Sequence, residues 1–323
     1  MNMQVELAES RKLSLRDRAA DYVNLTKPRI LLLNLLTALG AMSMAAQGNW
    51  PSASIILATL AGLALAIGAG GALNCFIERD SDAKMERTAD RPLPSGRMRP
   101  LEALIFGTIL WIASYFLLYF CVNPTTAFLT MFAFGSYVGV YTPLKTRTSI
   151  CTLVGAVPGA LPPLIGWSAV RGHVDWGGFL LFSILFLWQI PHFLSLALLR
   201  SDEYARAGMP MLPVESSRGG GAETTRHQIL LYTAALALVS LLPYGFLGAG
   251  RVYLCMAAVL GSVFLFLALI GHAGHGWTSA ESARDGASRL SAARRSDAGW
   301  CKQFFYYSLL YLVLLFGTLV FDS

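Results

Sequence analysis

The chain has 323 residues, of which 55% are hydrophobic and only 14% charged, and its formal net charge at pH 7 is +6. This composition excludes an ordinary soluble enzyme and indicates a protein that crosses a membrane several times. The five cysteines show no Cys-x-x-Cys spacing, so neither a disulfide framework nor a zinc ribbon is expected.

Nine apolar segments are long enough to cross a bilayer, at about 20 residues each. They cover approximately residues 30–46, 54–77, 101–121, 125–141, 150–170, 176–199, 229–247, 252–270 and 304–321. The expected fold is therefore all-α, a polytopic bundle of about nine transmembrane helices. We expect residues 1–28 to form a cytoplasmic N-terminal segment and residues 29–323 a single transmembrane domain. Within that domain, the Gly-, Ala-, Ser- and Arg-rich segment 272–300 is predicted to be a flexible cytoplasmic loop.

Basic residues gather on one side of the predicted membrane. With the N-terminus in the cytoplasm, 23 of the 25 Lys and Arg residues fall in cytoplasmic segments, and only Arg171 and Arg251 fall outside. The positive-inside rule therefore predicts a cytoplasmic N-terminus. The basic charge needs no nucleic-acid partner to explain it.

A charged stretch follows the second apolar segment without an intervening turn. Asn74, Glu78 and Asp82 are spaced four residues apart, so they stack on one face of a continuing helix. Three oxygen-bearing side chains at a helix C-terminus are a plausible seat for a hard divalent cation such as Mg²⁺. The alternative is a solvated loop of mixed charge at the membrane edge.

Further charged groups are expected at the same membrane face, because the second, fourth and sixth spans all end in the cytoplasm. Arginine and lysine side chains there would bind the oxygens of phosphate or diphosphate. The candidate diphosphate-binding residues are Lys84, Arg87, Arg91, Lys145 and Arg147. The candidate metal ligands are Asn74, Glu78, Asp82, Asp202 and Glu203. Together these groups predict a metal-bridged diphosphate site.

One ionisable residue lies inside a predicted span. His192 precedes Arg200 by eight residues, which places it about 12 Å inside the helix end. Ionisable groups within membrane spans are functional more often than those in soluble cores. The alternative is a structural hydrogen bond to a neighbouring helix, for which Gln189 would serve equally well.

The motifs of this chain resemble those of the intramembrane prenyltransferases of the UbiA superfamily. They are Asn-x3-Glu-x3-Asp at 74–82, Arg-Thr-x-x-Arg-Pro-Leu-x-x-Gly at 87–96 and Tyr-x3-Lys at 141–145. The stretches 159–167, 188–193 and 207–213 narrow the resemblance to the branch that farnesylates haem. One departure concerns the second acidic motif, an Asp-x3-Asp repeat in the wider superfamily. Here Arg206 stands four residues after Asp202, so only Asp202 and Glu203 remain.

The resemblance implies an enzyme that uses Mg²⁺ and transfers a farnesyl group from farnesyl diphosphate to a vinyl group of haem B. Addition of water would give haem O, for the assembly of haem–copper oxidases. It implies catalytic roles for Asn74, Glu78, Asp82 and Lys145. Because His192 is an ionisable residue inside a span, we expect it to be catalytic too and to bind the haem acceptor, by ligating its iron or by steering a propionate or water. The expected location is the bacterial cytoplasmic (inner) membrane with the site facing the cytoplasm, and a haem-handling membrane protein is an expected partner downstream.

Two other functions stay open at this point. One is a related prenyltransferase that acts on an aromatic acid or quinone precursor, which would need no histidine at position 192. The other is a transporter of a phosphorylated solute. A transporter would distribute polar groups across the bilayer midplane, whereas these motifs gather at one face.

Overall fold

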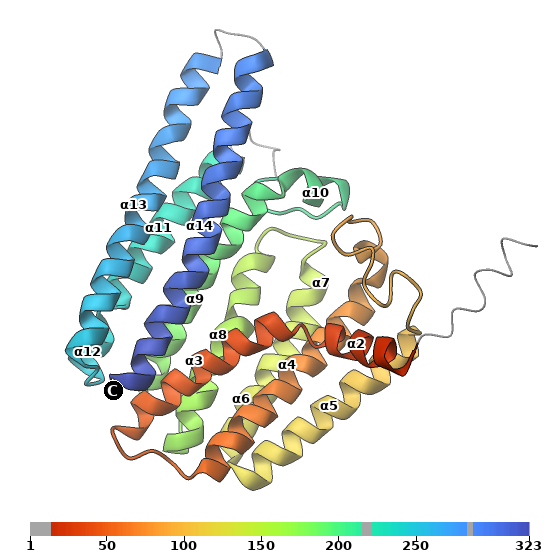
Figure 1. Ribbon diagram of the computed structural model, residues 1–323, viewed down its shortest axis with the longest axis vertical. Coiled ribbons are helices and arrows are strands. Elements are labelled where there is room, and N and C mark those ends of the chain that lie inside the picture. Colours follow the sequence, from red (N-terminus) through yellow and green to blue (C-terminus); the bar gives the residue numbers. More distant parts are fainter. Residues whose placement is uncertain (1–13, 215–220, 283–286, 323) are drawn as a thin grey trace, which may run out of the picture.

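The structure is a computed structural model that describes residues 14–214, 221–282 and 287–322, with only the backbone described for the residues within 274–297. The described residues form helices that pack side by side, and they include no β-strand (Figure 1). Nine of these helical segments are long and apolar enough to cross a membrane. The prediction of an all-α polytopic bundle is therefore confirmed. Its orientation stays a prediction.

The helices follow the order of the predicted apolar segments. The first half of the chain forms α2 (Leu15–Leu25), α3 (Pro28–Ala46), α4 (Ala53–Asp82), α5 (Pro100–Cys121), α6 (Pro124–Gly135), the π-helix η1 (Ser136–Tyr141) and α7 (Thr142–Leu144). The second half forms α8 (Cys151–Arg171), α9 (Trp176–Leu199), α10 (Ser201–Arg206), α11 (Gly221–Val239), α12 (Leu242–Phe246), α13 (Arg251–Ser282) and α14 (Ala287–Phe321).

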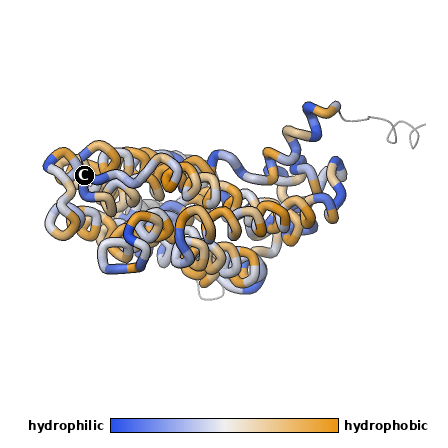
Figure 2. The backbone as a smooth tube through the Cα atoms, turned by 90° about the horizontal axis from the view of Figure 1, so that it is seen from below, coloured by the Kyte–Doolittle hydropathy of each residue, from blue (hydrophilic) through white to orange (hydrophobic). Residues whose placement is uncertain are grey.

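Helices α8 and α9 occupy the centre of the bundle and are the most deeply buried of the candidate spans. Three prolines, Pro158, Pro162 and Pro163, lie within α8, yet the helix is continuous. Prolines are tolerated in a span when the surrounding helices enclose the freed backbone carbonyls, and all three proline residues are buried. Figure 2 shows the resulting pattern, with hydrophobic colour along the packed helices and hydrophilic colour concentrated in the connecting segments.

Helix α2 lies across one end of the bundle and packs against α4 (Figure 1). Ser14 and Asp17 form a capping box at its start, which satisfies the first free amides. At its end Leu25 is fully buried. Its carbonyl approaches Gly71 of α4 so closely that a Cβ at that position would clash with it. Residues 14–28 of the predicted N-terminal segment are therefore tied to the transmembrane bundle, while residues 1–13 lie outside the described residues.

The segment 272–300, predicted to be a loop, is mostly helical. Helix α13 continues to Ser282 and α14 begins at Ala287, so both helices project past the rest of the bundle (Figure 1). Alanine and arginine have high helix propensity, and extending an existing helix requires no new nucleation step. The composition of this segment predicted an irregular loop, whereas its described residues are mostly helical. The flexibility and cytoplasmic location of the segment stay predictions, and residues 283–286 lie outside the described residues.

Candidate functional site

The C-terminal end of α4 presents the three residues that the sequence predicted to share a face. Asn74, Glu78 and Asp82 are all buried, with exposed fractions of 0%, 9% and 1%. Asp80, between them in sequence, is exposed on the other side of the helix. The four-residue spacing therefore directs three oxygen-bearing side chains towards the interior of the bundle.

Each of these three side chains is paired with a cation from a different part of the chain. Lys27 Nζ donates a hydrogen bond to Asn74 Oδ1. Lys145 Nζ lies 2.8 Å from Glu78 Oε1. Arg91 Nη1 donates to Asp82 Oδ2 at 2.6 Å. The end of α4 is thus surrounded by three cationic groups at short range.

Lys27 is a site residue that sequence reasoning missed. It stands between α2 and α3 and has a left-handed backbone conformation, with φ of 53°. This conformation is uncommon for a residue with a side chain and points to a functional constraint. The only sequence signal is a lysine followed by Pro28 at the edge of the first span, and nothing in the spacing connects it to Asn74. Asn74 also donates from Nδ2 to Thr142 Oγ1 at 3.3 Å, so it joins three segments of the bundle.

Lys145, which contacts Glu78, follows an irregular stretch of helix. The π-helix η1 precedes it, and such π-turns occur frequently at functional sites. The ammonium lies 4.8 Å from the centre of the Tyr141 ring, a cation–π contact. Burial alone would lower the pKa of Lys145, but the neighbouring Tyr141 and Glu78 outweigh it and raise the pKa well above its usual value. Lys145 is therefore cationic at neutral pH.

Gly155 of α8 provides the space for the Tyr141 ring. A Cβ at this position would clash directly with the ring. We expect Gly155→Ala to displace Tyr141 and Lys145, to cost about 1–3 kcal/mol of stability and to lower activity. The measurement is the thermal unfolding midpoint of the purified variant in detergent.

Gly139→Ala is the matched control, because a Cβ there has no neighbouring atom within 4 Å. Equal midpoints for the two variants would contradict the proposed role of Gly155.

The connection between α4 and α5, which carries Arg91, is fixed by contacts to both α4 and α2. Thr88, which is buried, donates to the Asp82 carbonyl at 2.8 Å. Arg97 donates to the Asp90 carbonyl at 2.7 Å and lies 3.4 Å from Asp21 of α2. The connection is therefore a folded unit clamped between α4 and α2.

The remaining basic candidates are more exposed. Arg87 lies 3.9 Å from Glu203 Oε1 and is 44% exposed. Lys84 and Arg147 are exposed, and neither makes an ion pair within the described part of the chain. All three side chains are exposed, so a ligand at this end of the bundle can reach them.

The two acidic candidates on α10 point in different directions. Glu203 is largely buried, and it accepts a hydrogen bond from Arg200 at 2.8 Å. Asp202 is exposed. Only Glu203 therefore faces the connection that carries Arg87, and the sequence could not distinguish these two neighbours.

His192 lies on a different face of the bundle core, between α9 and α14. Its ring stacks on Trp188 at 4.6 Å and on Phe305 at 4.5 Å between centroids. Its Nδ1 lies 2.6 Å from Ser308 Oγ. The structure therefore contains the interhelical hydrogen bond expected of a structural histidine, and the described contacts of His192 include none of the charged residues at the end of α4. Gln189 instead donates to carbonyls of Ala156 and Leu185.

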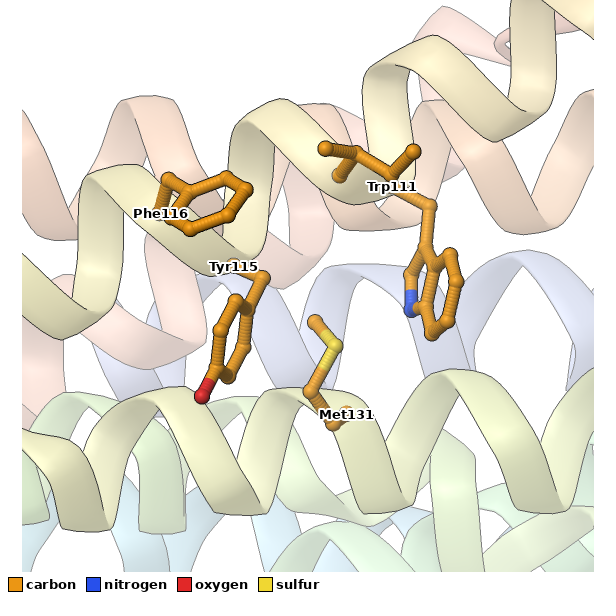
Figure 3. Close-up of a pocket in the computed structure, with 5 residues that line it drawn as sticks. Trp111, Tyr115, Phe116 and Met131 are labelled. Carbon is orange, nitrogen blue, oxygen red and sulfur yellow. The ribbon is translucent and has the colours of Figure 1, made fainter.

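A cavity of about 280 Å³ lies away from these charged groups, between α5 and α6. Trp111, Tyr115, Phe116 and Met131 surround it, as Figure 3 shows. No charged group lines it, so it suits a hydrocarbon chain and not a diphosphate.

The donor set at the end of α4 fits Mg²⁺. This ion prefers oxygen ligands, uses few carboxylates and completes its shell with waters and substrate phosphates. Among the described residues, no three His, Cys, Asp or Glu side chains gather closely enough to form a complete metal site. An incomplete set of protein oxygens beside several cations is the arrangement that a metal–diphosphate complex requires.

Comparison with known proteins identifies the family. The UbiA prenyltransferase family matches residues 34–282, most of the chain. This protein belongs to the UbiA prenyltransferase family. Its membership disfavours the transporter alternative and establishes a membrane-embedded prenyltransferase.

Curated relatives of this UbiA protein extend over nearly its whole length. A protein of Myxococcus xanthus (strain DK1622) named protoheme IX farnesyltransferase is 45% identical over 309 residues, which cover 96% of each chain. A protein of Sorangium cellulosum (strain So ce56) with the same name is 46% identical over 273 residues, covering 84% of this chain and 88% of the relative.

Solved UbiA structures share the fold at low identity. A digeranylgeranylglyceryl phosphate synthase structure superimposes with a TM-score of 0.68 at 16% identity, covering 92% of this chain and 98% of that one. A UbiA homologue from Archaeoglobus fulgidus bound to GPP and Mg²⁺ gives a TM-score of 0.61 at 16% identity, covering 90% and 99%.

Proposed function

We propose that this protein is a protoheme IX farnesyltransferase, which transfers a farnesyl group from farnesyl diphosphate to a vinyl group of haem B and produces haem O. The observation that carries this proposal is the 45% identity, over 96% of both chains, to a relative of that name. The buried oxygen and cation pairs at the end of α4 supply the matching chemistry. A prenyltransferase of an aromatic or quinone precursor is the alternative within the family.

The residues at the end of α4 would bind the diphosphate end of the donor. Asn74, Glu78 and Asp82, with Glu203 from α10, would hold Mg²⁺, which neutralises charge on the leaving diphosphate. Lys145, Arg91, Arg87 and Lys27 would donate to the diphosphate oxygens, and Lys84 and Arg147 would approach them from the exposed side. Donors that are already held in position lower the energy of the developing charge without reorganisation.

Departure of the diphosphate leaves an allylic cation on the farnesyl chain. The π electrons of the haem vinyl group form the new carbon–carbon bond, and the cation that results beside the porphyrin is captured by water, which then loses a proton. The apolar bundle keeps bulk water from the allylic cation before this bond forms. His192 would bind the haem acceptor, by ligating its iron or by orienting a propionate or water.

The distribution of basic residues also bears on the membrane in which the protein lies and on its orientation there. The charge distribution supports insertion into the bacterial cytoplasmic (inner) membrane with the α4 end facing the cytoplasm. Haem B and farnesyl diphosphate are the substrates, and a haem-handling membrane protein that serves haem–copper oxidases would receive the product.

The test is a direct conversion. Purified protein in nanodiscs is incubated with haem B, farnesyl diphosphate and Mg²⁺, and haem O is measured by mass spectrometry. EDTA should stop the reaction. A parallel incubation replaces haem B with 4-hydroxybenzoate, and a prenylated benzoate without any haem O would establish the alternative.

His192→Ala should separate the two substrates. We expect weaker binding of haem B and an altered haem absorption spectrum, with the affinity for farnesyl diphosphate close to that of the wild type. Haem and donor titrations measure the two affinities independently. An unchanged haem spectrum and a normal rate of haem O formation would show that His192 is structural.

A further inference from the structure

The Ser308 hydroxyl of α14 contacts two polar groups, one of which is the imidazole of His192. Its hydroxyl lies 2.6 Å from the Phe305 carbonyl and 2.6 Å from His192 Nδ1. A carbonyl oxygen can only accept, so the single hydroxyl hydrogen of Ser308 is donated to Phe305. The hydroxyl oxygen can then only accept from the histidine. In this arrangement His192 Nδ1 carries the ring hydrogen and Nε2 carries the lone pair, which is the tautomer on which the inference below rests.

This bond pattern leaves one ring nitrogen available. The described residues provide no hydrogen-bond partner for Nε2. The rings of Trp188 and Phe305 both stack on the imidazole, with interplanar angles of 18° and 25°, and these contacts hold the plane of the ring. The ring keeps a small exposed fraction of 7%, and the neighbouring Phe193 is exposed.

A second contact fixes Ser308 itself. Trp188 Nε1 donates to the Ser308 carbonyl at 2.7 Å, so α9 holds both the backbone and the side chain of this residue. Trp188 and His192 are four residues apart on α9, and Phe305 and Ser308 are three apart on α14. The four side chains form one cluster that orients a single imidazole.

Histidines that ligate metals generally donate their second ring N–H to an acceptor, which fixes the tautomer and raises the basicity of the ligating nitrogen. We infer that Ser308 is a positioning residue that presents His192 Nε2 as an axial ligand to the iron of the haem substrate. This inference rests on the proposed function, and it assigns to His192 iron ligation and not contact with a propionate.

The experiment is resonance Raman spectroscopy of ferrous haem B bound to the purified protein. The wild type should show an iron–histidine stretching band that is absent from His192→Ala. Ser308→Ala should keep the band but move it to lower frequency, because the ligating nitrogen becomes less basic, and should weaken haem binding about 10–100-fold. Ser308→Thr, which retains the hydroxyl, should show the iron–histidine band at the wild-type frequency.

Ser114→Ala is the matched control. Ser114 is also fully buried and bonds across helices, from α5 to the Gly62 carbonyl of α4, but it lies apart from His192. The Ser114→Ala substitution should leave the iron–histidine stretching band unchanged. If the wild type has no iron–histidine band, or if Ser308→Ala leaves both frequency and affinity unchanged, the inference is wrong. Formation of haem O by the same wild-type sample would show that the proposed function stands independently.

Discussion

Asp82→Asn is expected to reduce haem O formation by about 10²–10³-fold while the protein still inserts and folds. The substitution removes a negative charge from a buried position where a metal ligand is proposed. An amide oxygen can still accept the hydrogen bond from Arg91, so the packing around the residue is largely preserved. The rate is measured by mass spectrometry under saturating Mg²⁺, and folding by the thermal midpoint.

Asp80→Asn provides the control for this prediction. Asp80 is two residues away on the same helix, but its side chain is 84% exposed and faces away from the site. The control should retain nearly full activity. A fully active Asp82→Asn enzyme, or wild-type turnover in EDTA, would contradict the metal assignment.

Lys145→Met should damage both stability and activity. It leaves the buried Glu78 carboxylate without its cation, and an uncompensated buried charge costs about 3–5 kcal/mol. It also removes a donor from the leaving diphosphate, for which we expect a loss of about 10²–10³-fold in rate. The thermal midpoint and the rate of haem O formation measure the two effects.

A double variant separates the two effects. Glu78→Gln combined with Lys145→Met removes both charges, so the midpoint should recover while the activity stays low. Arg16→Gln, at an exposed position of α2 that is not among the candidate site residues, controls for a general loss of positive charge. Recovery of activity together with stability in the double variant would show that the pair is structural only.

Hydropathy and helical periodicity predicted the parts of this molecule that depend on local sequence. Apolar length alone located the nine candidate spans found among the described residues, and the four-residue spacing placed Asn74, Glu78 and Asp82 on one buried face. Topology then brought Lys145 to the same end of the bundle. These predictions succeeded because a membrane leaves a chain few ways to satisfy its backbone polar groups.

The missed features depend on tertiary geometry. Lys27 itself has the left-handed backbone conformation that turns the chain between α2 and α3, and its side chain contacts Asn74 from this turn. Glu203 and Asp202 are adjacent, and only the docking of a six-residue helix decides which faces inward. Ser308 stands in an apolar span, where its sequence context reveals nothing of His192 on another helix.

Asn74, Glu78 and Asp82 are each paired with a cationic side chain of the same chain, so substrate binding has to replace these internal pairs with contacts to the ligands. A divalent cation that binds Asn74, Glu78 and Asp82 has to compete with Lys27, Lys145 and Arg91 for the same oxygens. A diphosphate has to compete with those oxygens for the same three cations. Each ligand releases the groups that the other needs, so the metal and the diphosphate should promote each other's binding by the same factor, as linkage requires.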